Sequence, residues 1–162
     1  MHPLLQTHTT FTALHTDNMS SNSNQITEGT YTIKNVSTGT VMDLYDGLAA
    51  EGTQIQGFKG HGGDNQKWHL KYTGNGHSLT LQNVKSGTYL SFSAIKNSTR
   101  VVGSRTARNI VLVSSKNGYV METAEKREYV LDLKESNPAN ETPVIIYNDN
   151  NTDNQKWHFI PA

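Results

Sequence analysis

The chain has 162 residues, enough for one ordinary domain, and its 14 Lys and Arg balance its 14 Asp and Glu. This balance excludes the electrostatic footprint of a nucleic-acid-binding protein, and no apolar run is long enough for membrane insertion. Only 34% of the residues are hydrophobic, which favours short strands joined by turns. None is cysteine, which favours a reducing, cytoplasmic location.

Residues 1–26 predict a disordered N-terminal tail. They show no hydrophobic periodicity, and the run of Ser and Asn at 20–24 is typical of a linker. The segment also lacks the basic start and the continuous apolar stretch of a secretory signal. We therefore expect one folded domain over 27–162. It begins with Thr30–Lys34, where polar and apolar residues alternate as in a half-buried strand.

The folded part repeats itself. Residues 41–70 align without a gap over 130–159, and 11 of the 30 positions are identical, including the run Asp-Asn-Gln-Lys-Trp-His. A middle copy is indicated by Ile33–Val36, which returns as Leu81–Val84. Downstream, the middle copy is expected to lose roughly four residues. The three copies are placed at about 28–74, 75–117 and 118–162.

Each copy contains four short segments with strand character. They are Thr30–Lys34, Val41–Leu44, Thr53–Gly57 and Lys67–Tyr72 in the first copy, Ser78–Gln82, Tyr89–Ser93, Arg100–Gly103 and Ile110–Ser114 in the second, and Tyr119–Glu122, Tyr129–Leu133, Pro143–Tyr147 and Lys156–Ile160 in the third. Twelve short strands predict an all-β fold. Three copies of four strands predict a closed threefold barrel, because a solenoid needs capping repeats and a propeller needs more than three blades.

The triplets Gln66-Lys67-Trp68 and Gln155-Lys156-Trp157 stand near the ends of the first and third copies. A Gln-x-Trp near the end of repeats of roughly 45 residues resembles the ricin-B-type (R-type) β-trefoil lectins. The run Gly29–Val36 and the lack of cysteine look especially like the mushroom members of that family. The resemblance covers about 28–162. It implies a β-trefoil that binds sugars without cofactor or metal, and in which Trp68 and Trp157 are structural.

Binding a sugar ring in water needs three kinds of group. A carboxylate accepts charge-assisted hydrogen bonds from two neighbouring hydroxyls, an aromatic face covers the apolar C–H side of the ring, and an amide fixes a third hydroxyl. In the first copy the resemblance assigns these roles to Asp43, Phe58 and Asn65. The supporting residues that it implies are Gln56, Gln66 and the turn Asp46-Gly47.

The third copy keeps most of this set. The matching residues are Asp132, Tyr147, Asn154 and Gln155. Ile145 replaces the polar Gln56, and Glu135-Ser136 replaces the turn, so we expect a site whose affinity or specificity differs from the first. By the resemblance, both sites favour galactose, N-acetylgalactosamine or glycans that end in them.

The second copy predicts no such site. Ser91 stands where the Asp belongs and Val102 where the aromatic belongs, and only Asn109 matches. In the first copy, the loop Gly60-His61-Gly62-Gly63 is able to approach a ligand closely. His61 is expected to be an ordinary solvent-exposed histidine, with contact to a second sugar as the alternative.

Three other functions are weighed against sugar binding. Catalysis is not expected, because the chain has neither a Gly-x-Ser-x-Gly elbow nor a His-x-x-x-His pair, and its candidate Asp residues fall one per copy. A proteinase inhibitor stays open, since mushroom β-trefoils include such proteins. So does a trefoil that binds only protein partners. For a lectin, two sites per chain or a homodimer would supply avidity, and the mushroom relatives imply a defensive role.

Overall fold

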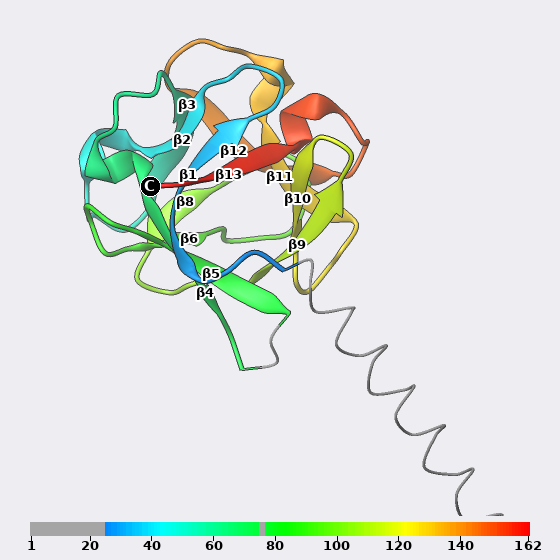
Figure 1. Cartoon of the computed structure of the whole chain (residues 1–162), viewed down its shortest axis with the longest axis horizontal. Helices are drawn as coiled ribbons and strands as arrows, with labels where there is room; N and C mark the ends of the chain where they lie inside the picture. The colour runs from blue at the N-terminus through cyan, green and yellow to red at the C-terminus, as the bar shows by residue number, and fades with distance from the viewer. Residues whose placement is uncertain (1–24, 75–76) are drawn as a thin grey trace, which may run out of the picture.

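The computed structural model describes residues 25–74 and 77–162 (Figure 1). Of the predicted tail 1–26, only the last two residues fall within this range; the others lie outside the described residues. The strands are β1 (Gly29–Asn35), β2 (Val41–Leu44), β3 (Thr53–Phe58), β4 (Trp68–Tyr72), β5 (Ser78–Asn83), β6 (Tyr89–Ser91), β7 (Thr99–Arg100), β8 (Val102–Ser104), β9 (Ile110–Ser115), β10 (Gly118–Thr123), β11 (Tyr129–Leu133), β12 (Thr142–Asn148) and β13 (Trp157–Pro161).

Six of these strands close a barrel. β1 pairs with β4, β4 with β5, β5 with β9, β9 with β10, β10 with β13, and β13 returns to β1. The last of these pairings places the red C-terminal strand β13 beside the blue β1 in Figure 1. Each copy contributes its first and last strand to this ring, so each copy depends on the other two to close the barrel.

Apart from the short β7, which pairs with β12, the remaining strands form hairpins over one end of the barrel. They pair as β2 with β3, β6 with β8, and β11 with β12, and the hairpins meet where β3 pairs with both β8 and β12. Closed barrel and hairpin cap in three copies make a β-trefoil, so the predicted fold class is confirmed.

The core lies between the barrel wall and the cap. Alternating side chains of each strand point inward, and Ile33, Met42, Leu44, Trp68 and Trp157 are among the fully buried residues. In the part of the chain that the structure describes, there is no helix long and apolar enough to cross a membrane.

One strand of the middle copy differs from the prediction. The segment expected as a single strand, Arg100–Gly103, is divided between β7 and β8. The fully buried Val101 lies between them and bonds outside its own hairpin, donating its N–H to Val144 O and accepting from Ile55 N. Because of this break, the described part of the chain has thirteen strands in place of the expected twelve.

Candidate functional site

The first predicted site lies on the outer face of the β2–β3 hairpin. Met42 and Leu44 point into the core, so Asp43 between them points to the opposite face. On β3, Gln56 pairs directly with Asp43, and Phe58 pairs with Val41, two residues earlier. The hairpin register therefore brings the predicted carboxylate and the predicted aromatic ring to one face.

Three amides hold the carboxylate of Asp43. Gln56 Nε2 donates to Oδ1 over 3.1 Å, while Asn65 Nδ2 and Gln66 Nε2 donate to Oδ2 over 3.2 Å and 2.9 Å. The second N–H of Asn65 goes to Leu44 O, at 3.1 Å. Both side-chain N–H groups of Asn65 therefore position the carboxylate and its strand, and only the side-chain oxygen is free to bind a ligand.

The environment of Asp43 has opposing effects on its pKa. Burial raises the pKa of this carboxyl above its ordinary value, since only 2% of the residue is exposed. Four neighbours lower this pKa without reversing the shift. They are the hydrogen bonds from Gln66 and Gln56, the nearby His61, and the hydrogen bond from Asn65. The site therefore holds a desolvated carboxylate, in which hydrogen bonds from a ligand are stronger than in open solvent.

His61 lies closer to the carboxylate than the favoured interpretation, a solvent-exposed histidine, predicted. Its side chain is 47% exposed, as expected, yet its Nε2 lies 3.8 Å from Asp43 Oδ2 and its ring meets that of Phe58 edge to face. The N–H of Gly63 donates to Nδ1, so Nε2 is the ring nitrogen that faces the carboxylate. The signal available in the sequence was the Gln66 side chain, whose Oε1 accepts from the backbone N–H of His61 and folds this loop inward.

The turn Asp46-Gly47 follows β2 at the edge of the site. Both residues are left-handed, with φ of 47° and 62°. A Cβ on Gly47 would lie 2.6 Å from Lys85 Cγ, so both conformation and space favour glycine there. Glu135 and Ser136 adopt the same backbone in the third copy, with φ of 55° and 57°.

The third copy reproduces the geometry of the first. Asn154 Nδ2 donates to Asp132 Oδ1 over 3.1 Å, and Gln155 Nε2 donates to Oδ2 over 2.9 Å. Ile145 pairs with Asp132 at the position of Gln56, so this carboxylate has one amide fewer. Burial again raises the pKa of Asp132, against hydrogen bonds from Gln155 and Asn154 that lower it.

A hollow of about 310 Å³ lies over the third carboxylate. Its lining residues are Ser98, Asp132, Lys134, Glu135, Ile145, Tyr147, Asn150 and Asn154. Five of the residues predicted or discussed for this site, including Tyr147, therefore share one concave surface.

The middle copy requires a correction of register. Ser91 pairs with Val102 as Asp43 pairs with Gln56, so Val102 matches Gln56 and not the aromatic residue. The aromatic position is the one that pairs with the residue two before the Asp position. In the middle copy that pairing joins Tyr89 and Ser104, so Ser104 stands in the aromatic position. The sequence alignment was wrong by two residues here, because the β6–β8 hairpin is two residues shorter than the β2–β3 hairpin.

The same correction moves Asn109. Its carbonyl accepts from Ala124 N as the carbonyl of Lys67 accepts from Val84 N. Asn109 therefore matches Lys67, and the predicted match to Asn65 is wrong; Ala107 stands there. The offset between first and second copy falls from 48 at Asn35 to 42 at Lys67, so six residues are lost, not four. With Ser91, Ser104 and Ala107 in the key places, the copy still lacks the predicted site.

Gln66 and Trp68 act as structural residues, with Gln155 and Trp157 as their counterparts. Each indole is fully buried and donates to a strand carbonyl, Trp68 to Met42 O at 3.0 Å and Trp157 to Leu131 O at 3.2 Å. Gln66 Nε2 also donates to Lys59 O over 2.9 Å. In each Gln-x-Trp motif, the Gln therefore binds the site carboxylate while the Trp ring stays buried in the core.

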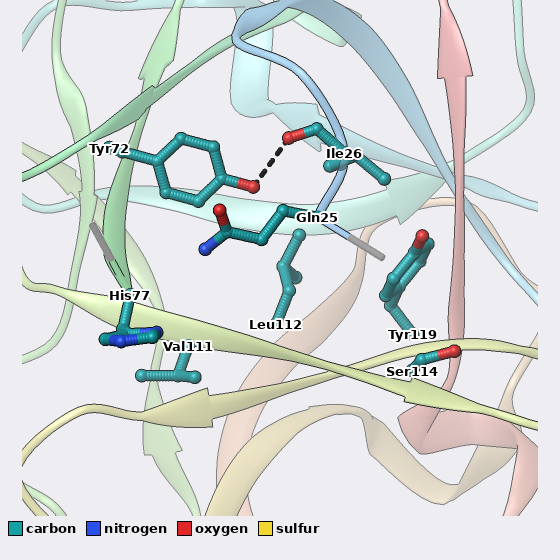
Figure 2. Close-up of a pocket in the computed structure, with 8 residues that line it drawn as sticks. All are labelled: Gln25, Ile26, Tyr72, His77, Val111, Leu112, Ser114 and Tyr119. Atoms are coloured by element: carbon teal, nitrogen blue, oxygen red, sulfur yellow. Dashed lines mark hydrogen bonds between the residues drawn. The ribbon is translucent and has the colours of Figure 1, made fainter. Parts of the chain in front are cut away.

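A separate hollow of about 170 Å³ lies between β4, β9, β10 and the chain at Gln25 and Ile26 (Figure 2). Tyr72 closes one side by donating its hydroxyl to Ile26 O over 2.6 Å. None of the predicted site residues lines this hollow. Among residues 25–74 and 77–162, no group of three or more His, Cys, Asp or Glu side chains is placed to hold a metal ion.

Fold and site together define a sugar-binding class of trefoil, and comparison with known proteins identifies it. The model of the ricin-type beta-trefoil lectin domain-like family matches residues 11–104. The chain belongs to this family, as the Gln-x-Trp repeats indicated. No curated protein sequence matches it.

Solved structures agree with this assignment. The agglutinin of Rhizoctonia solani is 64% identical and superposes with a TM-score of 0.84 over 85% of this chain and 98% of that one. The ricin B-like lectin of Macrolepiota procera, solved with lactose, is 28% identical with a TM-score of 0.76 over 86% of this chain and 100% of that one. ThreeFoil, a designed threefold-symmetric protein, is 22% identical with a TM-score of 0.78 over 83% and 100%, and shows the fold alone.

Proposed function

We propose that this lectin-family chain binds galactose, N-acetylgalactosamine or glycans that end in them, through shallow sites on its first and third copies. The observation that carries the proposal is the duplicated constellation. Asp43 with Phe58 and Asp132 with Tyr147 each combine a buried, amide-held carboxylate with a ring on the same hairpin face. An aspartate that only caps a turn with its side chain would need no aromatic ring beside its carboxylate.

The chemistry of galactose fits this arrangement. Its axial O4 and equatorial O3 present two adjacent donors to one carboxylate, and its opposite face is free to stack on a ring. In the first site Nε2 of His61 adds a polar atom within reach of the same hydroxyls, since it lies 3.8 Å from Asp43 Oδ2. The lactose bound to the 28% identical Macrolepiota procera lectin supports a galactoside as ligand.

We further propose how and where the sites work. Single shallow sites bind weakly, so two sites per chain, or a homodimer, supply avidity through effective concentration. No metal or cofactor and no catalytic step take part. The absence of cysteine from all 162 residues favours a reducing compartment, the cytoplasm. We include in this proposal a defensive role for the chain, as the resemblance to mushroom lectins implies.

Calorimetry with galactose, N-acetylgalactosamine, lactose and mannose tests the proposal. We expect the first three sugars to bind and mannose to give no heat. The alternative, a proteinase inhibitor, is tested with the same preparation by its effect on papain and trypsin. Protease inhibition without sugar binding would overturn the lectin proposal and favour the inhibitor.

A further inference from the structure

Three of the four exposed large apolar side chains in the described ranges lie at the candidate sites, and the fourth, Ile160, lies on β13. Four are exposed in the described ranges: Tyr45 at 40%, Leu48 at 46%, Tyr147 at 36% and Ile160 at 43%. Tyr45 and Leu48 share one turn, closed by a hydrogen bond of 3.1 Å from Leu48 N to Tyr45 O. Tyr147 is the predicted stacking ring of the third copy. Scattered exposed residues need no explanation, but a pair on one turn beside a candidate site does.

Tyr45 lies on the same face of the hairpin as Asp43. Leu44, between them, is fully buried in the core and has an extended backbone, with φ of −88° and ψ of 121°. The alternation of side chains therefore continues from β2 into Tyr45. Phe58 pairs with Val41, on the other side of Asp43. The carboxylate consequently has one aromatic residue on each side along the strand.

The third copy shows that this position faces the space above the carboxylate. Lys134 occupies the place of Tyr45, and it lines the hollow of about 310 Å³ together with Asp132 and Tyr147. The two candidate sites thus also differ at this ligand-facing position. The first has an exposed aromatic ring there, and the third has a flexible cation.

We propose that Tyr45 forms a second subsite in the first copy, which binds the ring attached to the galactose of a larger galactoside. This inference rests on the proposed function, in which the galactose ring itself binds to Asp43 and Phe58. The attached sugar or aromatic aglycone then stacks on Tyr45, whose exposed ring offers an apolar face at little conformational cost. Lys134 offers no such face, so the third site discriminates less between galactose and its extended glycosides.

The test isolates each site by removing the other carboxylate. Asp132→Ala leaves the first site, and Asp43→Ala leaves the third. Calorimetry then compares galactose with the α and β 4-nitrophenyl galactosides, because the anomer decides on which side the aglycone leaves the ring. In Asp132→Ala we expect one anomer to bind about fivefold more tightly than galactose.

Variants of the two equivalent positions decide the role of Tyr45. Adding Tyr45→Lys to Asp132→Ala should abolish the aglycone preference and leave galactose affinity unchanged, while Tyr45→Phe should keep both. Adding Lys134→Tyr to Asp43→Ala should create the preference in the third site. The midpoint of urea unfolding verifies that each variant is folded.

Two results would overturn the inference in different ways. If Asp132→Ala binds galactose but shows no aglycone preference, or if Tyr45→Lys weakens all ligands equally, the second subsite is wrong and the proposed function stands. If folded Asp132→Ala binds neither galactose nor either glycoside, the first-copy site itself is wrong, and the subsite with it.

Discussion

Gln66 donates a hydrogen bond of 2.9 Å from Nε2 to Oδ2 of Asp43. Gln155 donates to Asp132 over the same distance, 89 residues later. The glutamine of each Gln-x-Trp motif therefore binds the carboxylate of its own copy. The most recognisable sequence motif of the chain lies beneath the candidate site and fixes its charged group.

Replacing Gln66 by leucine should destabilise the fold by about 3 kcal/mol, because a buried carboxylate loses a donor and Lys59 O loses its partner. Urea unfolding measures the effect. Gln82→Leu is the matched control. The Gln82 side chain donates a hydrogen bond to Gly87 O in an exposed setting, and the loss of this bond should cost less than about 1 kcal/mol. Equal effects in the two variants would contradict the role given to Gln66.

Trp68→Phe should cost roughly 2 kcal/mol in unfolding free energy and leave galactose affinity unchanged. The substitution leaves Met42 O without its donor and opens a small cavity, yet the indole is fully buried and cannot touch a ligand. Thermal unfolding and calorimetry on the same sample separate the two effects. A folded variant with normal stability and weakened sugar binding would show that Trp68 has a role in the site.

Sugar affinity should fall on acidification at a pH above 3.8, the ordinary pKa of an aspartate. Burial raises the pKa of Asp43 and of Asp132, so protonation removes the hydroxyl acceptors earlier than in an exposed carboxyl. A raised folded-state pKa has the opposite effect on stability. These groups contribute stability that is fully present below 3.8 and is lost as the pH rises through the raised values. Binding and unfolding measured from pH 3 to 7 should therefore diverge, and affinity that declines only together with unfolding would contradict this account.

Exchanging the residue opposite each carboxylate, Gln56 in the first site and Ile145 in the third, should change the pH at which galactose affinity is lost. Gln56 lowers the pKa of Asp43 through its hydrogen bond. Gln56→Ile, which copies Ile145, should move the loss of galactose affinity at the first site to higher pH. Ile145→Gln should move the third site in the other direction. The measurement is calorimetry across pH in Asp132→Ala and Asp43→Ala backgrounds, and unchanged midpoints would show that this hydrogen bond does not tune the carboxylate.

The sequence was sufficient to predict the barrel and both copies of the constellation. Residues 41–70 and 130–159 repeat without a gap, so the register of Asp, aromatic and Asn transferred directly between the copies. The middle copy was misaligned because the residues that anchor the register are all substituted there. Ile110 stands in place of the Trp, pairing with Thr123 as Trp68 pairs with Asn83, and only backbone pairing reveals this.

The surroundings of the carboxylate were harder to predict. The approach of His61 to Asp43 depends on the path of a Gly-rich loop, which Gln66 fixes by accepting from the His61 N–H. Tyr45 was overlooked because strand alternation had to be continued one residue beyond the end of β2. The path of the His61 loop is a tertiary feature, whereas the position of Tyr45 follows from the local alternation of β2.

The central claim, two carboxylate-based galactoside sites per chain, is tested most directly by counting sites. Galactose is titrated into the unmodified chain, Asp43→Ala, Asp132→Ala and the double variant, with Phe58→Ala and Tyr147→Ala as independent disruptions of each site. We predict two sites in the unmodified chain, one in each single variant and none in the folded double variant. Galactose binding that survives in the double variant, or no binding by the unmodified chain, would contradict the claim.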